Sequence, residues 1–161
     1  MPHGIASSQP IPRKGFVVLD FGVILGGYCS DMTRTVHMGR ASKQAREMYE
    51  VVRKAQERAV AAVRPGVQAG EVDQAARQVL EQAGLGRYFT HSTGHGVGLE
   101  IHEPPRLGKG QVELLRPGMV VTVEPGAYVA GRGGVRIEDM VVVTGKGCEV
   151  LTPTTKELIE L

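Results

Sequence analysis

The stretch VVTVEPG, residues 120–126, is an apolar, β-branched run that ends in a glutamate directly before a Pro-Gly turn. Such a run predicts a buried strand. The earlier stretch VVLDFG, residues 17–22, has the same plan with an aspartate. In each case a second carboxylate follows. Asp31 lies eleven residues after Asp20, and Glu138 lies fourteen residues after Glu124. This faint internal repeat predicts that two pairs of strands each deliver two carboxylates.

Between the two copies the hydrophobic periodicity changes to that of helices. Apolar residues recur every three or four positions over residues 42–64, and Pro65-Gly66 ends the pattern. A second amphipathic helix is predicted over residues 70–82, with Gly84 as its C-cap. After it, helical signal returns only in the last few residues. The predicted strands span residues 15–22, 31–36, 91–99, 119–124, 135–144 and 148–151.

The composition is that of a globular protein with one domain, residues 1–161. Of these residues 42% are hydrophobic, and a chain of this length can bury a core without disulfides or a structural metal. The 19 basic residues are spread along the chain and exceed the 17 acidic ones by two, which argues against nucleic-acid or membrane partners. No apolar run resembles a membrane span or a signal peptide. Two distant cysteines, Cys29 and Cys148, are typical of a reducing compartment, so we expect a cytoplasmic protein.

Four carboxylates, Asp20, Asp31, Glu124 and Glu138, lie in or beside otherwise apolar strands, and one histidine, His95, lies in a Gly-rich stretch. A buried charge costs several kcal/mol unless it is paired or bound to a metal. Ion pairing alone, in a structural protein, is the weaker alternative because few basic residues lie nearby. Carboxylates with one imidazole suit Mn²⁺, Co²⁺, Fe²⁺ or Zn²⁺, and four negative charges exceed what one such ion neutralises. The set therefore predicts two ions that share carboxylates and activate water for hydrolysis.

These residues stand in motifs that resemble the dinuclear metallopeptidases of the pita-bread fold, which include methionine aminopeptidase, Xaa-Pro aminopeptidase and prolidase. The resemblance covers nearly the whole chain, and the order of the motifs makes it specific. It implies an α+β fold in which helices cover the outer face of a curved antiparallel sheet. The fold is expected to be incomplete at the N-terminus, because the family has two further helices and a strand there. The motifs are LDFG at 19–22, SDMTRT at 30–35, GHGVGL at 94–99, HEPP at 102–105, VEPG at 123–126 and RIED at 136–139.

The resemblance implies a role for each candidate ligand. Asp20 would chelate one divalent ion, His95 and Glu124 would bind the other, and Asp31 and Glu138 would bridge the two. Manganese or cobalt is expected, with zinc or iron as alternatives. Glu124 would also act in catalysis by carrying the proton from water to the leaving amine.

Further residues match positions on the substrate side. His102 would hydrogen-bond the scissile carbonyl as a catalytic residue, and His91 would line the pocket and take part in catalysis. Tyr128 resembles a pocket tyrosine. Arg136 would orient a carboxylate ligand or face the substrate, with a structural ion pair to a buried aspartate as the alternative. His3 would bind substrate, with a terminal residue of no function as the alternative.

The motifs around Asp31 and Glu138 resemble the Xaa-Pro aminopeptidase and prolidase branch rather than methionine aminopeptidase. This implies cleavage before proline, in a peptide or dipeptide with proline at its second position. The alternatives are a truncated, catalytically impaired module that keeps metal or peptide binding, and a methionine aminopeptidase-like enzyme. Without the N-terminal helices, the first two strands would keep an uncovered apolar side, which predicts a homo-oligomer. His37 matches no motif and is expected on a strand, facing solvent.

Overall fold

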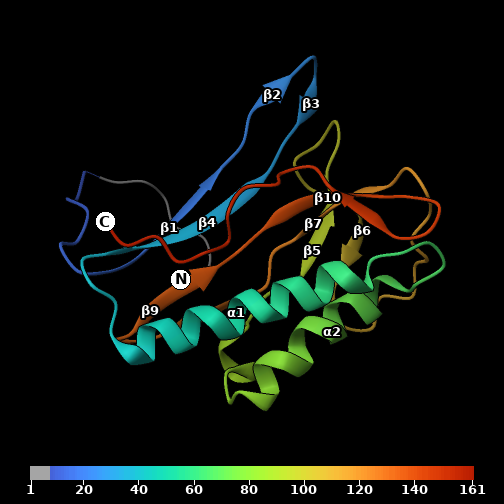
Figure 1. The fold of residues 1–161 in the computed structure, drawn as a ribbon. Coiled ribbons are helices and arrows are strands. Elements are labelled where there is room, and N and C mark those ends of the chain that lie inside the picture. The colour runs from blue at the N-terminus through green and yellow to red at the C-terminus, as the bar shows by residue number, and fades with distance from the viewer. Residues whose placement is uncertain (1–7) are drawn as a thin grey trace.

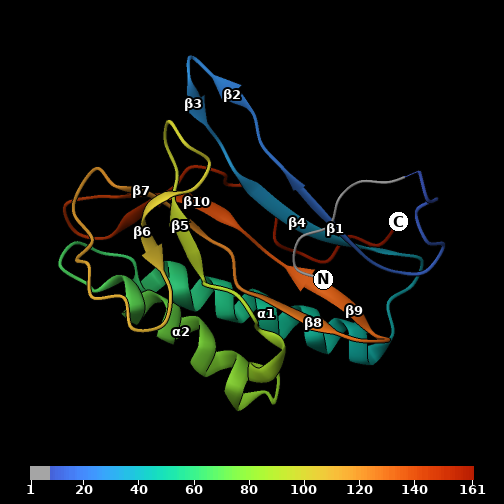
Figure 2. The same cartoon turned by 180° about the vertical axis from the view of Figure 1, so that it is seen from behind.

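The computed structural model describes residues 8–161, so the predicted role of His3 falls outside the described residues. Two helices lie side by side against one face of the strands, and a narrow hairpin projects on the opposite side (Figure 1). Seen from behind, the same layers appear in reverse, with β5 and β6 nearer the viewer (Figure 2). Among the described residues, neither helix combines the length and the apolar character needed to cross a membrane.

Both helices begin and end close to the positions that the periodicity predicts. Helix α1, Lys43–Ala62, begins after Ser42, whose hydroxyl accepts a hydrogen bond from the N–H of Ala45 at 3.2 Å. Helix α2, Ala69–Gln82, is followed by Gly84, which adopts a φ of 72° and donates its N–H to the carbonyl of Glu81. A left-handed glycine just beyond the last turn is the usual end of a helix.

Five antiparallel strands form the larger sheet, in the spatial order β11-β10-β7-β5-β6. β7 and β10 lie at its centre, and their residues are buried almost throughout. The strands are β5 (Gly94–Gly96), β6 (Glu103–Leu107), β7 (Val120–Val123), β10 (Asp139–Val143) and β11 (Cys148–Val150).

Three two-stranded ribbons complete the fold. β1, Gly15–Phe21, pairs antiparallel with β4, Met32–Met38, and β2, Ile24–Leu25, pairs with β3, Tyr28–Cys29, to form the projecting hairpin. β8, Gly126–Val129, pairs with β9, Gly133–Arg136, and both β1 and β4 pack against β9. A short 3-10 turn, Gly86–Tyr88, follows α2.

The hydrophobic core lies between the helices and the strands of the second half. The apolar stripe of α1 packs against β7 and β9, and α2 packs against α1 and β6, as expected for amphipathic helices on a sheet. The most deeply buried members are Tyr49, Val52, Ala55, Ala59, Val72, Ala76, Leu80, Leu107, Val121, Val123, Ile137 and Val141.

The predicted elements need four corrections. The predicted strand over residues 135–144 is two strands, because the N–H of Glu138 leaves the ladder and donates to the carbonyl of Thr33 on β4 at 3.1 Å. Only Gly94–Gly96 of the predicted strand 91–99 is extended in the ladder, and strands β6 and β8 were not predicted. The last residues form no helix, since Ile159 and Leu161 hydrogen-bond along β4 instead.

The same C-terminal residues account for a wrong prediction at His37. This side chain is 4% exposed rather than facing solvent, and its ring packs edge-on against Phe16. Its backbone N–H and carbonyl pair with Ile159 and Leu161. The uncovered apolar side expected on the first strands is therefore absent at β4, because β9 and the C-terminal segment cover that strand. Exposed residues remain at the end of β1 and on the β2–β3 hairpin.

Candidate metal centre

Four of the five predicted ligands lie at or beside strand ends, and the fifth lies within a strand. Asp20 lies near the end of β1, Asp31 directly precedes β4, and Glu124 directly follows β7. Glu138 occupies the break between β9 and β10, and His95 is the central residue of β5. Both copies of the predicted repeat direct their carboxylates to the same hollow. The lining of this hollow includes all five side chains.

His95 is presented by two glycines. A Cβ atom at Gly94 would collide with the backbone of Thr122, and one at Gly96 would collide with the backbone of Pro104. Only glycine therefore lets β5 approach the neighbouring strands so closely. This packing leaves the His95 side chain as the one group of the GHG segment that enters the site.

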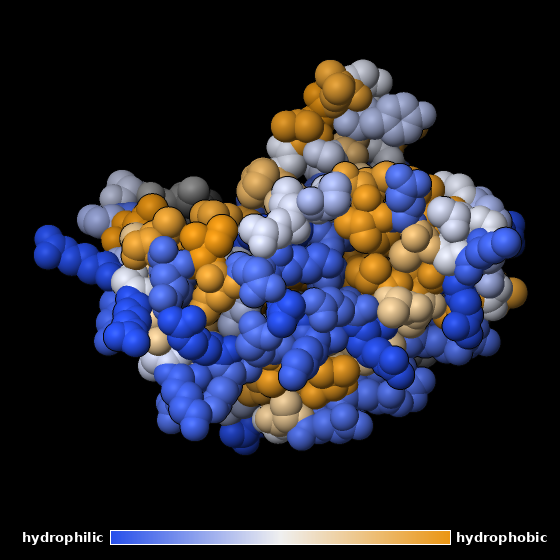
Figure 3. All heavy atoms as spheres, viewed as in Figure 1, coloured by the Kyte–Doolittle hydropathy of each residue, from blue (hydrophilic) through white to orange (hydrophobic). Residues whose placement is uncertain are grey.

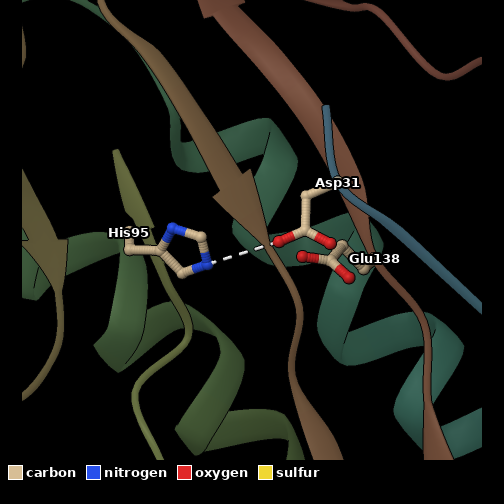
Figure 4. A group of neighbouring side chains, drawn as sticks. All are labelled: Asp31, His95 and Glu138. Atoms are coloured by element: carbon tan, nitrogen blue, oxygen red, sulfur yellow. Dashed lines mark ion pairs between the residues drawn. The ribbon is translucent and has the colours of Figure 1, made fainter. Parts of the chain in front are cut away.

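Three of the ligands already lie at distances suited to one ion. One donor atom from each of Asp31, His95 and Glu138 lies within 4.8 Å of the other two, and the three side chains converge in Figure 4. The Nε2 atom of His95 is 3.7 Å from Oδ2 of Asp31 and 3.3 Å from Oε1 of Glu124. Imidazole and carboxylate are the ligand types of manganese, cobalt, iron and zinc sites.

Glu138 shows most directly that the site fits a cation. Its Oε2 accepts a 2.5 Å hydrogen bond from the Thr33 hydroxyl, while Oε1 is buried without a hydrogen-bond partner among the described residues. Burial, reinforced by the negative charges of Glu124 and Asp31, raises the pKa of Glu138 to about 9. A buried carboxylate atom with no donor is costly, and a divalent ion would satisfy it.

The pKa values of the neighbouring candidate ligands Asp31 and His95 are raised as well. Burial and the charge of Asp20 raise the pKa of Asp31 above its ordinary value. Burial disfavours the charged form of His95, yet its contact with Glu124 outweighs this, so its pKa is raised as well. Closely spaced carboxylates that oppose one another's ionisation are the arrangement that bound cations stabilise.

Arg136 is buried beside the ligands and contacts Asp20. Its Nη2 donates to Oδ2 of Asp20 at 2.5 Å, its Nε donates to the Thr33 hydroxyl, and its Nη1 donates to the Tyr128 hydroxyl at 3.0 Å. The Asp20 side chain is 47% exposed, so this is not the ion pair with a buried aspartate that was the alternative. The geometry corresponds to a guanidinium that orients a candidate ligand.

The histidines predicted on the substrate side border the ligands. His102 is exposed, and its ring centre lies 4.3 Å from that of His95. His91 contacts the Tyr128 hydroxyl through Nε2 at 3.1 Å, which connects it to Arg136 through one shared tyrosine. Tyr128 therefore links His91 to Arg136 by hydrogen bonds.

Two hollows adjoin the ligands, and His95, His102 and Glu124 line both of them. The first, of about 480 Å³, adds apolar side chains from Phe21 to Ile24 and from Ile101. The second, of about 520 Å³, is lined mostly by polar and charged residue types. Its other lining residues are His91, Ser92, Glu103, Pro104, Arg106, Gln111 and Glu113.

Sequence reasoning missed the residues that support this site. Arg106 lies on β6 with its side chain exposed, whereas Pro105 and Leu107 are buried, so strand alternation after HEPP could have placed it toward the hollow. Thr33 left only a faint signal, as a polar residue among strand residues of SDMTRT. Its contact with Glu138 joins positions 105 residues apart, which no local pattern reveals.

The chain matches known proteins over almost its whole length. The model of metallopeptidase family M24 matches residues 1–145. The "Xaa-Pro dipeptidase" of Pyrococcus furiosus is 49% identical over 159 residues, which are 99% of this chain and 46% of that protein. Thus the chain spans about half the length of the curated relatives it matches.

Solved structures give the same result for the fold. An Xaa-Pro dipeptidase from Bacillus anthracis has 50% identity and a TM-score of 0.98, covering 100% of this chain and 45% of that one. The prolidase from Pyrococcus horikoshii has 47% identity and a TM-score of 0.96, covering 99% and 46%. The predicted pita-bread fold is confirmed. With its motifs, its ligand geometry and these matches in agreement, the chain belongs to metallopeptidase family M24.

Proposed function

We propose that the chain carries the site of a metal-dependent peptidase that cleaves the bond between an N-terminal residue and proline. The observation that carries the proposal is the buried, partnerless Oε1 of Glu138 among three other carboxylates and His95. The names of the relatives, Xaa-Pro dipeptidases, support this substrate class over that of methionine aminopeptidase.

Two divalent ions would be held by the five ligands. Asp31 and Glu138 would bridge them, Asp20 would complete one position, and His95 with Glu124 would complete the other. Manganese or cobalt is proposed, with zinc or iron as alternatives, because hard oxygen donors dominate the set. When bound, such ions lower the pKa of water and polarise a carbonyl group.

The chain's own residues would then move protons and orient the substrate. The Glu124 carboxylate borders both hollows, so it can accept a proton from water and deliver it to the leaving proline nitrogen. The exposed imidazole of His102 can donate a hydrogen bond to the carbonyl oxygen of the scissile bond. Arg136 holds Asp20 in place through its 2.5 Å contact.

The two hollows support a short substrate that crosses the ligands. The first hollow, with the apolar side chains of Phe21 to Ile24 and Ile101, suits the side chain of the first residue, and the second hollow suits the proline half, with His91 and Arg106 near its carboxylate. Tyr128 would act through its hydrogen bond with His91. A dipeptide is the substrate proposed first, and an Xaa-Pro-initiated longer peptide is the alternative.

The 161-residue protein, loaded with Mn²⁺ or Co²⁺, should cleave Leu-Pro but not Leu-Ala, and a chelator should abolish the cleavage. Leu-Pro-Gly separates dipeptidase from aminopeptidase action. Glu138→Gln should lose activity, whereas the matched change Glu149→Gln on the exposed part of β11 should keep it. Two bound ions without cleavage of any Xaa-Pro substrate would refute the peptidase and favour a metal-binding or peptide-binding module.

A homo-oligomer is proposed from the exposed apolar surface. Apolar side chains gather on the projecting hairpin at the top of Figure 3, where Ile24 and Leu25 are exposed together with Val23 and Tyr28. Apolar patches of this kind mark interaction sites, and a two-fold pair would cover each copy with the other. The unpaired thiols of Cys29 and Cys148 support a cytoplasmic location.

A further inference from the structure

A second cluster of charges is buried beneath the candidate ligands. It pairs Arg34 with Asp139 at 2.6 Å and Lys156 with Asp139 at 2.5 Å. Gln56 of α1 donates to the same carboxylate at 2.9 Å and accepts from Lys156 at the same distance. Asp139 itself is fully buried, so this cluster joins α1, β4, β10 and the C-terminal segment in the interior.

The backbone of Glu138 is fixed by two residues of β4 that belong to, or adjoin, this cluster. Its N–H donates to the carbonyl of Thr33, and its carbonyl accepts from Nη1 of Arg34. Its Oε2 accepts from the Thr33 hydroxyl. Oε1 is the one polar atom of Glu138 that these contacts leave open, and one carboxylate oxygen of Glu138 lies within 4.8 Å of ligand atoms of Asp31 and His95.

Arg34 makes contacts that depend on the fork shape of its guanidinium. Nη1 bonds to the carbonyls of Thr33 and Glu138, and Nη2 bonds to Asp139. Its Nε donates to the carbonyl of Thr155 at 3.0 Å. A lysine would keep the positive charge but has one nitrogen, so it cannot span these acceptors.

We propose that Arg34, anchored by Asp139, is a positioning residue that sets the place of Glu138 relative to Asp31. Asp31 lies three residues before Arg34 and directly before the same strand, so one guanidinium controls the spacing of the two proposed bridging carboxylates. This inference rests on the proposed function. Loss of the guanidinium fork should weaken the binding of the second metal ion more than that of the first. Two metal ions can share the carboxylates of Asp31 and Glu138 only if both carboxylates keep their relative positions. Residues that orient ligands typically change metal affinity by about 10–100-fold.

The test is titration of the metal-free protein with Mn²⁺ by calorimetry, with the exchange-coupled EPR signal of a manganese pair as a second readout. Arg34→Lys should bind the second ion about 10–100-fold more weakly, with loss of the coupled signal. Its kcat on Leu-Pro should fall, while KM stays near the wild-type value. The control is Arg46→Lys, which alters the 2.7 Å pair between α1 and Glu160 of the C-terminal segment without reaching the ligands.

Melting temperatures of the metal-free variants separate positioning from folding. If Arg34→Lys does not fold, Asp139→Asn keeps the shape of the anchor and removes its charge, and it should show the same selective loss of the second ion. A folded Arg34 or Asp139 variant that binds both ions with wild-type affinity would overturn the positioning role alone. Failure of the wild-type protein to bind two ions would overturn the proposed function, and this inference with it.

Discussion

The two copies of the internal repeat hold their carboxylates in different surroundings. In the second copy, the side chain of Glu124, which corresponds to Asp20, is 12% exposed and contacts His95, and the following acid, Glu138, is 2% exposed and is bonded on three of its four polar atoms. In the first copy, the Asp20 side chain is 47% exposed and contacts Arg136. The same plan of strand, acid and turn thus gives one rigid, buried ligand and one open ligand.

The difference follows from what covers each pair of strands. β7 and β10 are central in the five-stranded sheet, and α1 and α2 pack beneath the second half. β1 pairs with one strand only, and its last residues are exposed. Equivalent positions of a repeat can therefore differ in their surroundings, with a largely buried carboxylate in the second copy and a half-exposed one in the first.

The largest effect is expected at the buried ligand. Glu138→Gln should abolish binding of two ions, because a neutral amide cannot bridge two dications against their repulsion. Asp20→Asn, at the open ligand, should weaken one position and leave the other occupied. Elemental analysis of the purified variants, with intact mass as a check, measures both. Equal metal content in the two variants would break the distinction between rigid and open ligands.

A smaller loss is expected at the substrate side. His102→Ala should lower kcat by about 10²–10³, the usual range for one lost donor to a developing oxyanion, with metal content unchanged. His102 is exposed and adjoins His95 through ring contact, so removing it leaves the ligand atoms in place. Steady-state kinetics and metal analysis on the same sample check this. Loss of metal would instead make His102 a ligand.

The fold class and the two helices could be predicted from the sequence, and so could the gathering of the candidate ligands, whose roles stay a prediction. The ligands stood out because charged residues in apolar strands need a local explanation, and the helices stood out by their periodicity. Several missed features are long-range: the C-terminal segment covers His37, and Arg34 reaches Glu138 and Asp139 across more than 100 residues. A periodic pattern reports which face of an element is buried, but it does not report what buries it.

A further effect concerns pH in the metal-free protein. The pKa of Glu138 is about 9 in the folded state, against 4.5 for an unperturbed glutamate. The unfolded chain therefore releases this proton first, and stability should fall as pH rises from about 4.5 toward 9. Glu138→Gln has no proton to release, so its melting temperature should exceed that of the wild type by a margin that grows with pH. Melting temperatures of both proteins, measured in chelator at pH 5 and pH 8, give this difference. A difference that is smaller at pH 8 than at pH 5 would contradict a raised pKa for Glu138.

The smallest effect on stability is expected in the open half. Leu25, on the projecting hairpin, is 81% exposed, so Leu25→Ser should change the free energy of unfolding by less than about 0.5 kcal/mol. The same change should weaken self-association, because it removes apolar surface from the patch proposed to join two copies. Light scattering over a range of concentrations measures the association, and Leu114→Ser, another exposed leucine that lies outside this hairpin, is the matched control. If the wild-type chain is a 17.3 kDa monomer at micromolar concentration, the hairpin does not mediate assembly, and its apolar side chains serve the adjoining hollow instead.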